Sequence, residues 1–212
     1  AYRRAVRASS LVFETREAIS KFIGCRSPEL VIFTLNATDA LNIAIKGSLE
    51  PGSHVIITSM EHNSVVRPLR YLESRGEISL SICPCFSDGV PDIDAFRKLF
   101  RKNTRLVTCI HASNVNGVLM PVREMSGITH EHEALFLLDA AQTVGVLPVN
   151  IAELGADMLV FSAHKGLMGP MGVGLLCLRK EISLQSFRQG GTGSRSEEER
   201  QPDFFPDRLG AG

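Results

Sequence analysis

The sequence has no tryptophan, and only 6% of its 212 residues are aromatic. It also has no surplus of either charge, because 23 Lys and Arg residues balance 23 Asp and Glu residues. A chain without a basic surplus is a weak candidate for binding nucleic acid or an anionic membrane surface. Its apolar runs, such as Ala134–Leu138, fall far short of the roughly 20 residues that cross a bilayer. We therefore predict no nucleic-acid partner and no membrane-spanning helix.

Cysteine motifs are also lacking, since none of the five cysteines forms a C-x-x-C pair. An odd, unpatterned set in a chain of this size favours a reducing compartment, so we predict a cytoplasmic protein. The spacing of Cys83 and Cys85 is too weak a pattern to predict a metal site. We expect 130–132, which reads His-Glu-His, to be a solvated helix end.

The overall composition is that of a folded chain, with 44% hydrophobic and 22% charged residues. The sequence begins with Ala1 rather than Met and ends in a Gly-rich stretch, Leu209–Gly212, so we expect a piece of a longer protein.

Short β-rich runs alternate with amphipathic stretches along the chain. From Ala8 to Ile23 the apolar positions follow the helical period, and Gly24 suits the end of a helix. The predicted strands are Leu30–Leu35, His54–Thr58, Ile78–Cys83, Leu106–Ile110, Leu135–Leu138, Met158–Phe161 and Val173–Leu178. The predicted helices between them are Thr38–Lys46, Val66–Glu73, Ile93–Phe100 and Pro121–His132.

Several strand runs are apolar throughout, as expected when helices cover both faces of a parallel sheet. The link before Val173–Leu178 is too short for a parallel crossover, so this strand is predicted to be antiparallel. The sequence thus predicts an α/β fold with a mostly parallel sheet.

Polar residues follow five of the predicted strands, at the edge where open parallel sheets bind ligands. Ala37 and Thr38 open a helix and suit a phosphate, although Thr38 alone also suits a helix N-cap. Asp139 follows a buried strand and needs a cationic partner, either a ligand or an arginine, unless it caps a helix. Lys165 also leaves a buried strand and suits a Schiff base, although a lone lysine is more often a surface residue.

A phosphate site, a buried acid and a reactive amine on one edge together match the needs of pyridoxal 5′-phosphate, PLP. The chain has neither a G-x-G-x-x-G motif after a first strand nor a P-loop, which removes the usual nicotinamide and nucleotide readings.

The stretch Asp157–Lys165, continued by Gly169–Gly174, resembles the lysine motif of the class V aminotransferases, which are fold type I PLP enzymes. Three further stretches, Glu61–Ser64, His111–Asn114 and Leu138–Gly145, resemble the cysteine desulfurase and selenocysteine lyase branch. The resemblance covers the chain from about Phe13 onward and implies the three-layer α/β/α large domain of that fold type.

The resemblance also implies a role for each site residue. Lys165 would form the Schiff base, Asp139 would pair with the pyridine nitrogen, and Gln142 would bind the ring hydroxyl. His62 would stack on the ring and assist catalysis with Lys165, and Asn114 would lie beside the substrate. The phosphate would be held by Ala37, Thr38, Ser162 and His164.

By the same resemblance, L-cysteine would be converted to L-alanine and an enzyme-bound persulfide, with a sulfur-acceptor protein as a possible partner. Residues 1–185 would form the PLP-binding domain of a homodimer, and 186–212 would extend toward the partner subunit. The C-terminal small domain, with its thiolate and its carboxylate-binding arginine, is absent from these residues, so the chain alone should be inactive. Another class V activity (aminotransferase, selenocysteine lyase or epimerase) and a non-catalytic fragment remain alternatives.

Overall fold

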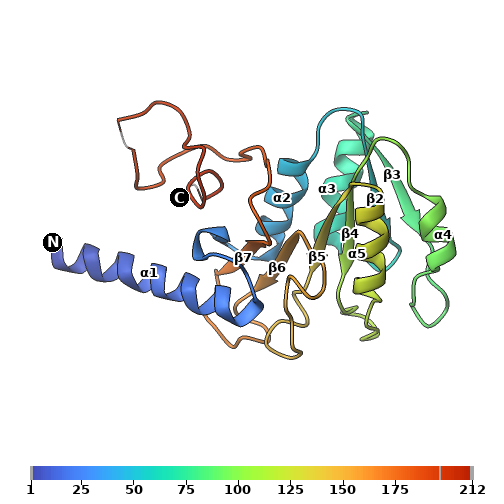
Figure 1. Ribbon diagram of the computed structural model, residues 1–212, viewed down its shortest axis with the longest axis horizontal. Helices are drawn as coiled ribbons and strands as arrows, with labels where there is room; N and C mark the ends of the chain where they lie inside the picture. The colour runs from blue at the N-terminus through green and yellow to red at the C-terminus, as the bar shows by residue number, and fades with distance from the viewer. Residues whose placement is uncertain (1, 196, 211–212) are drawn as a thin grey trace.

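The computed structural model describes residues 2–195 and 197–210 (Figure 1). The helices are α1 Tyr2–Ile23, α2 Ala37–Ser48, α3 Asn63–Ser74, α4 Ile93–Lys98 and α5 Val122–Glu131, with a short 3₁₀ turn at Pro28–Leu30. The strands are β1 Val31–Thr34, β2 Ser53–Thr58, β3 Ile78–Cys83, β4 Thr104–Ile110, β5 Leu135–Asp139, β6 Met158–Ser162 and β7 Gly174–Leu178. Every strand and helix predicted from the sequence is therefore confirmed, with small shifts at the ends except at the start of α1.

All seven strands form one sheet in the order β1-β7-β6-β5-β4-β2-β3. Neighbouring strands among β2 to β6 pair in parallel, whereas β7 is antiparallel to both β1 and β6. The predicted antiparallel strand is confirmed. Because β1 is antiparallel to β7, it points the same way as β6, so its carboxyl end lies at the same edge of the sheet.

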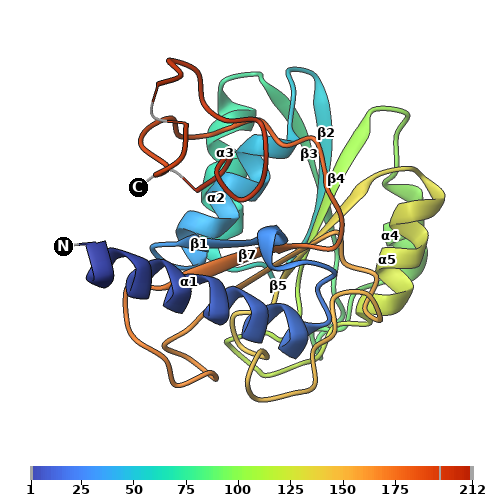
Figure 2. The same cartoon turned by 60° about the vertical axis from the view of Figure 1, so that its left-hand side comes forward.

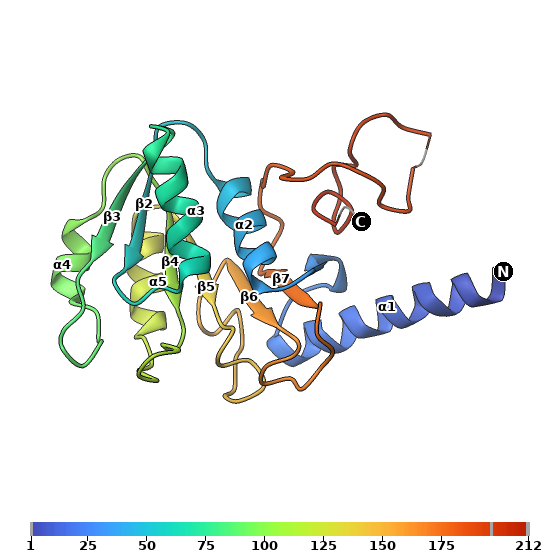
Figure 3. The ribbon, with the colours of Figure 1, turned by 180° about the vertical axis from the view of Figure 1, so that it is seen from behind.

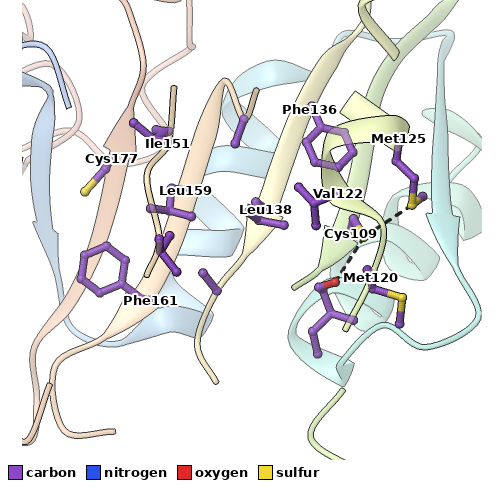
Figure 4. Close-up of a cluster of buried hydrophobic side chains, with 14 of the residues drawn as sticks. Cys109, Met120, Val122, Met125, Phe136, Leu138, Ile151, Leu159, Phe161 and Cys177 are labelled. Atoms are coloured by element: carbon purple, nitrogen blue, oxygen red, sulfur yellow. Dashed lines mark hydrogen bonds between the residues drawn. The ribbon is translucent and has the colours of Figure 1, made fainter. Parts of the chain in front are cut away.

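Helices cover both faces of this sheet. Alternate strand residues point to opposite sides, so that Ile32 belongs to the buried cluster that includes α2 and α3 residues, while Val31 belongs to the cluster that includes α4 and α5 residues. Figure 1 shows α5 in front of the sheet, and the reverse view in Figure 3 shows α2 and α3. Figure 4 shows the cluster on the α5 side, where Phe136, Leu138 and Leu159 lie fully buried. The predicted three-layer α/β/α architecture is confirmed.

Helix α1 differs from expectation. It begins at Tyr2, before Ala8, and its only buried residues are Ser20 and Ile23. Leu11 is 64% exposed and Phe22 54% exposed, so the apolar stripe does not pack on the core as its period predicts. Figures 1 and 2 show the reason, since most of α1 extends past the β1–β7 edge of the sheet.

After β7 the chain returns over α2 without a further helix or strand in its described residues, 179–195 and 197–210. Gln185 N–H donates to the Gly47 carbonyl at 2.7 Å, and Arg188 pairs with Asp39 at 3.1 Å. Leu209 is buried in the same cluster as α2. None of the helices in the described part of the chain is long and apolar enough to cross a bilayer.

The amino ends of the parallel strands carry a buried carboxylate, Asp157, just before β6. It pairs with Arg179 and with His130 Nε2, the latter at 2.8 Å, and accepts the Phe136 N–H at 2.9 Å. Burial alone would raise the pKa of Asp157, but these hydrogen bonds outweigh it, and the pKa lies below its ordinary value. The expectation of a solvated helix end at 130–132 is confirmed for Glu131 and His132, which are exposed, although His132 also stacks on Phe100 with ring centroids 4.2 Å apart. His130 is only half-buried and, in addition, pairs with Asp157.

Candidate active site

The carboxyl ends of five strands meet at one edge of the sheet and enclose a cavity of about 160 Å³. The segments that follow β1, β2, β4, β5 and β6 all contribute to its wall. All nine residues predicted for the site line this cavity: Ala37, Thr38, His62, Asn114, Asp139, Gln142, Ser162, His164 and Lys165. The sequence pattern therefore identified the right edge of the sheet, since parallel strands bring their carboxyl ends together.

The start of α2 forms one wall. Its N-cap is Asn36, whose side-chain oxygen accepts the Asp39 N–H at 2.9 Å, so the alternative reading of Thr38 as the cap is wrong. The Ala37 N–H donates to Ser162 Oγ at 3.1 Å, which joins the helix start to the end of β6. With the cap supplied by Asn36, the Thr38 hydroxyl faces the cavity beside the positive end of the helix dipole.

His62 is exposed and forms the N-cap of α3, which sequence reasoning from the residues alone did not predict. Its Nδ1 accepts the Ser64 N–H at 3.1 Å. Ser64 also lines the cavity, and its hydroxyl lies 3.0 Å from His62 Nδ1 and 2.7 Å from Thr38 Oγ1. Ser64 thus connects the two walls; its only signal in the sequence is its place two residues after His62.

Asp139 is the last residue of β5 and is 4% exposed. Its Oδ1 accepts the Ala141 N–H at 3.0 Å. No arginine pairs with it in the described residues, and a turn rather than a helix follows, so neither alternative reading of this acid holds. Burial raises its pKa, although the Ala141 N–H, Lys165 and His62 act in the opposite direction.

The remaining site residues lie on the turns after β4, β5 and β6. Lys165, His164 and Asn114 are exposed, whereas Gln142 is half-buried. The positive charge of Lys165 acts to lower the pKa of Asp139, as expected if the amine and the acid bind the same ligand. The roles of these side chains toward a cofactor stay predictions.

Two contacts tie these turns together. His111 Nδ1 lies 2.8 Å from Thr143 Oγ1, which links the turn after β4 to the turn that carries Gln142. Gly145 has a φ of +88°, and a Cβ built on it would lie 2.3 Å from the backbone carbon of Gly166. The turn after Asp139 and the turn after Lys165 therefore touch backbone to backbone, which only glycine permits.

The residues at this edge fit PLP. Asp139 is a buried carboxylate whose protein partners leave its pKa raised, so a cationic ring nitrogen would complete its pairing. The start of α2 offers the positive end of its helix dipole and the Thr38 hydroxyl to a phosphate, and Lys165 offers the amine. No cluster of three or more metal-binding side chains occurs among the residues that the structure describes.

A larger hollow of about 990 Å³ lies at the opposite edge, between Arg26, Lys180 and Phe205. It is formed where β1 begins and β7 ends, so the carboxyl ends of the parallel strands do not reach it. We assign the site to the smaller cavity, because the polar side chains of five strands converge there.

The chain resembles known proteins throughout its length. The family model for aminotransferase class-V matches residues 1–212. A cysteine desulfurase IscS from Dictyoglomus turgidum is 41% identical over 183 residues, which are 84% of this chain and 46% of that protein. A probable cysteine desulfurase from Methanothermobacter thermautotrophicus is 35% identical over 194 residues, 90% of this chain and 48% of that protein. The chain thus spans about half the length of the curated relatives it matches.

Solved structures agree with these relatives. The apo cysteine desulfurase from Thermococcus onnurineus NA1 superposes with a TM-score of 0.89 at 32% identity, covering 97% of this chain and 53% of that one. A structure described as SspA in complex with cysteine superposes with a TM-score of 0.83 at 30% identity, covering 91% of this chain and 56% of that one. The matched family model and the shared fold show that the chain belongs to the class-V aminotransferase family.

Proposed function

We propose that this chain is the cofactor-binding part of a PLP-dependent cysteine desulfurase, which converts L-cysteine to L-alanine and leaves the sulfur on the enzyme as a persulfide. The observation that carries the proposal is the cavity in which Lys165, Asp139 and Thr38 meet. The relatives named as cysteine desulfurases support this activity over the other class V reactions, and the bound cysteine in one similar structure supports the substrate.

Each side chain would have a defined task. PLP, when bound, supplies an electron sink for the bonds at the substrate Cα. Lys165 would hold the cofactor through its amine and take the proton from the substrate Cα, while Asp139 would stabilise positive charge on the ring nitrogen. His62 would cover the ring face, Gln142 would bind the ring hydroxyl, and Asn114 would lie beside the substrate.

The phosphate would be held where α2 begins. Its ligands would be Ala37, Thr38, Ser162 and His164, with the positive end of the α2 dipole favouring the negative charge.

The sulfur-accepting cysteine would lie outside these residues. Burial raises the pKa of Cys83 to about 12 and that of Cys109 and Cys177 well above its ordinary value. It also raises the pKa of Cys25. A buried neutral thiol is a poor nucleophile. Cys85 follows β3 and is not among the residues that line the cavity. We therefore expect the isolated chain to form no persulfide from L-cysteine. A protein that includes a small domain with a reactive cysteine and a carboxylate-binding arginine would form one, and an added dithiol would then reduce it to sulfide for detection.

The same proposal sets the organisation of the whole protein. Residues 1–185 would be the PLP-binding domain of a homodimer, and 186–212 would run toward the partner subunit; residues 196, 211 and 212 lie outside the described part. A sulfur-acceptor protein would take the persulfide sulfur. All five cysteines are free thiols, which suits a reducing, cytoplasmic location.

The first test is to identify the lysine that binds the cofactor. The chain is incubated with PLP, reduced with borohydride, digested and analysed by mass spectrometry. We expect the pyridoxyl tag on Lys165, and its loss in Lys165→Ala with an unchanged far-UV circular dichroism spectrum. The matched control is Lys180→Ala, which changes another exposed lysine and should leave the tag in place. A tag found on a different lysine would overturn the assignment.

A further inference from the structure

Glu61 joins two strands directly beneath the site. It lies between β2 and α3, next to His62, and its Oε1 accepts two hydrogen bonds. The Thr58 hydroxyl at the end of β2 donates at 2.6 Å, and the Ile110 N–H at the end of β4 donates at 3.0 Å. Glu61 thereby extends the contact between β2 and β4 past the point where the strands end.

The other carboxyl oxygen of Glu61 has a different environment. Although the residue keeps some exposure through its remaining atoms, Oε2 is buried and has no hydrogen-bond partner among the described residues. None of the ion pairs within residues 2–195 and 197–210 involves Glu61. A buried carboxylate without a cation is far less stable than the neutral acid, whose proton would sit on Oε2.

Two titratable groups from the neighbouring strands are coupled to this carboxyl: Asp139 at the end of β5 acts on Glu61, and Glu61 in turn acts on Cys109 within β4. Burial raises the pKa of Glu61 to about 8, and the hydrogen bonds from Thr58 and Ile110 offset this only in part, while Asp139 raises it further. Burial also raises the pKa of Cys109 well above its ordinary value, so this neighbour is a neutral thiol.

The local geometry shows what this acid would do for the site. Because Glu61 precedes the N-cap of α3, its hold on Ile110 fixes where His62 stands relative to β4. A second negative charge at this point would compete with Asp139 for its cationic partners. An ionised Glu61 would thus hold His62 in place but weaken the pairing of Asp139.

We propose that Glu61 is a positioning residue that remains a neutral acid at physiological pH, so that it fixes His62 without adding a second negative charge beside Asp139. The inference deepens the proposed function, on which the roles of His62 and Asp139 rest.

The protonation state is tested first by unfolding without any cofactor. In the folded chain Glu61 keeps its proton, whereas in the unfolded chain it loses the proton above its ordinary pKa of 4.5. Wild type therefore loses stability relative to Glu61→Gln as pH rises, by about tenfold in the unfolding equilibrium constant per pH unit between about pH 5 and pH 7. Glu50→Gln, which removes an exposed carboxyl just before β2, is the control and should track wild type. The proposal would be overturned if the ratio of the unfolding equilibrium constants of wild type and Glu61→Gln did not change with pH.

A second measurement uses only wild type, so it does not require that any variant fold. The carboxyl carbon of Glu61 in wild type, labelled with ¹³C, is titrated by NMR. We expect its inflection above neutral pH, and an inflection at or below 4.5 contradicts the proposal.

The positioning role is tested by the affinity for PLP, measured by absorption. Glu61→Gln keeps a neutral group with an acceptor oxygen, so it should restore most of the affinity that Glu61→Ala loses, a loss we place at roughly tenfold. Equal loss in both variants would contradict the positioning role. If wild type itself binds no PLP, the proposed function fails, while unfolding and NMR still decide whether Glu61 holds its proton.

Discussion

Asp139 and Asp157 are both buried aspartates at the ends of neighbouring strands, yet the chain treats them in opposite ways. Asp157 is 2% exposed and Asp139 is 4% exposed, so burial hardly distinguishes them. Asp157 has Arg179, His130 and the Phe136 N–H around it, and its pKa is lowered. Asp139 accepts the Ala141 N–H, and its pKa is raised.

The difference separates an acid with a structural role from one for which we propose a ligand-binding role. At the amino ends of the strands, the protein supplies every partner that its carboxylate needs. At the carboxyl ends, the pairing stays incomplete, which costs stability in the free protein and leaves affinity for a cationic group. Partners rather than burial therefore indicate where a ligand belongs.

The largest expected effect comes from exchanging each acid for its amide. Asp157→Asn should lower the free energy of unfolding by about 3 kcal/mol, because it leaves Arg179 half-buried without its counter-charge. Asp139→Asn should change it by less than about 1 kcal/mol and in the stabilising direction, since a buried unpaired charge is removed. Urea unfolding measures both variants.

For PLP binding, the order of the two variants should be reversed, with Asp139→Asn the more affected. Asp139→Asn should weaken PLP binding and lower the reactivity of the bound cofactor, while folded Asp157→Asn should bind PLP like wild type. A loss of stability in Asp139→Asn as large as that in Asp157→Asn would remove the distinction between the two acids.

The pH dependence of stability should differ for the two acids as well. The pKa of Asp157 is lowered, so its contribution is present above the ordinary value of 3.8 and is lost as pH falls through the folded-state pKa. The pKa of Asp139 is raised, so the folded chain loses stability as pH rises above 3.8 toward the folded-state value. In thermal melts, the melting temperature of Asp139→Asn should rise relative to that of wild type as pH rises. The melting temperature of Asp157→Asn should come closer to that of wild type as pH falls. Parallel profiles for the two variants would count against this assignment.

The smallest expected effect comes from replacing one histidine near the amino ends of the strands and one near their carboxyl ends. His130→Gln weakens one partner of Asp157, and because the His130 side chain is 34% exposed we expect a loss of about 1 kcal/mol. His164→Gln, at an exposed position in the cavity wall, should leave stability unchanged while weakening PLP binding. Calorimetry of both variants checks the ranking, which fails if His164→Gln proves the more destabilising.

Local sequence patterns predicted most of this fold. Apolar runs such as Leu135–Leu138 and Met158–Phe161 identify buried strands, and the short link before β7 predicts its direction. The site edge followed as well, because the carboxyl ends of parallel strands meet wherever the chain alternates strand and helix.

Other features depended on partners that are distant in sequence. The hydrogen bond from Ile110 N–H to Glu61 joins residues 49 positions apart, and that from His130 to Asp157 joins residues 27 apart. No local pattern encodes either contact. The stripe on α1 misled for a related reason, since an apolar period shows that a face is apolar without showing that the core reaches it.

The crossing of Gly145 and Gly166 gives the acid and the amine a common mechanical support. Because the turn after Asp139 and the turn after Lys165 meet at their backbones, a displacement of either one is transmitted to the other without an intervening side chain. The distance between the Asp139 carboxyl and the Lys165 amine therefore depends on main chain that extends from two neighbouring, hydrogen-bonded strands. Side chains around the cavity can change what the site accepts while this spacing stays the same.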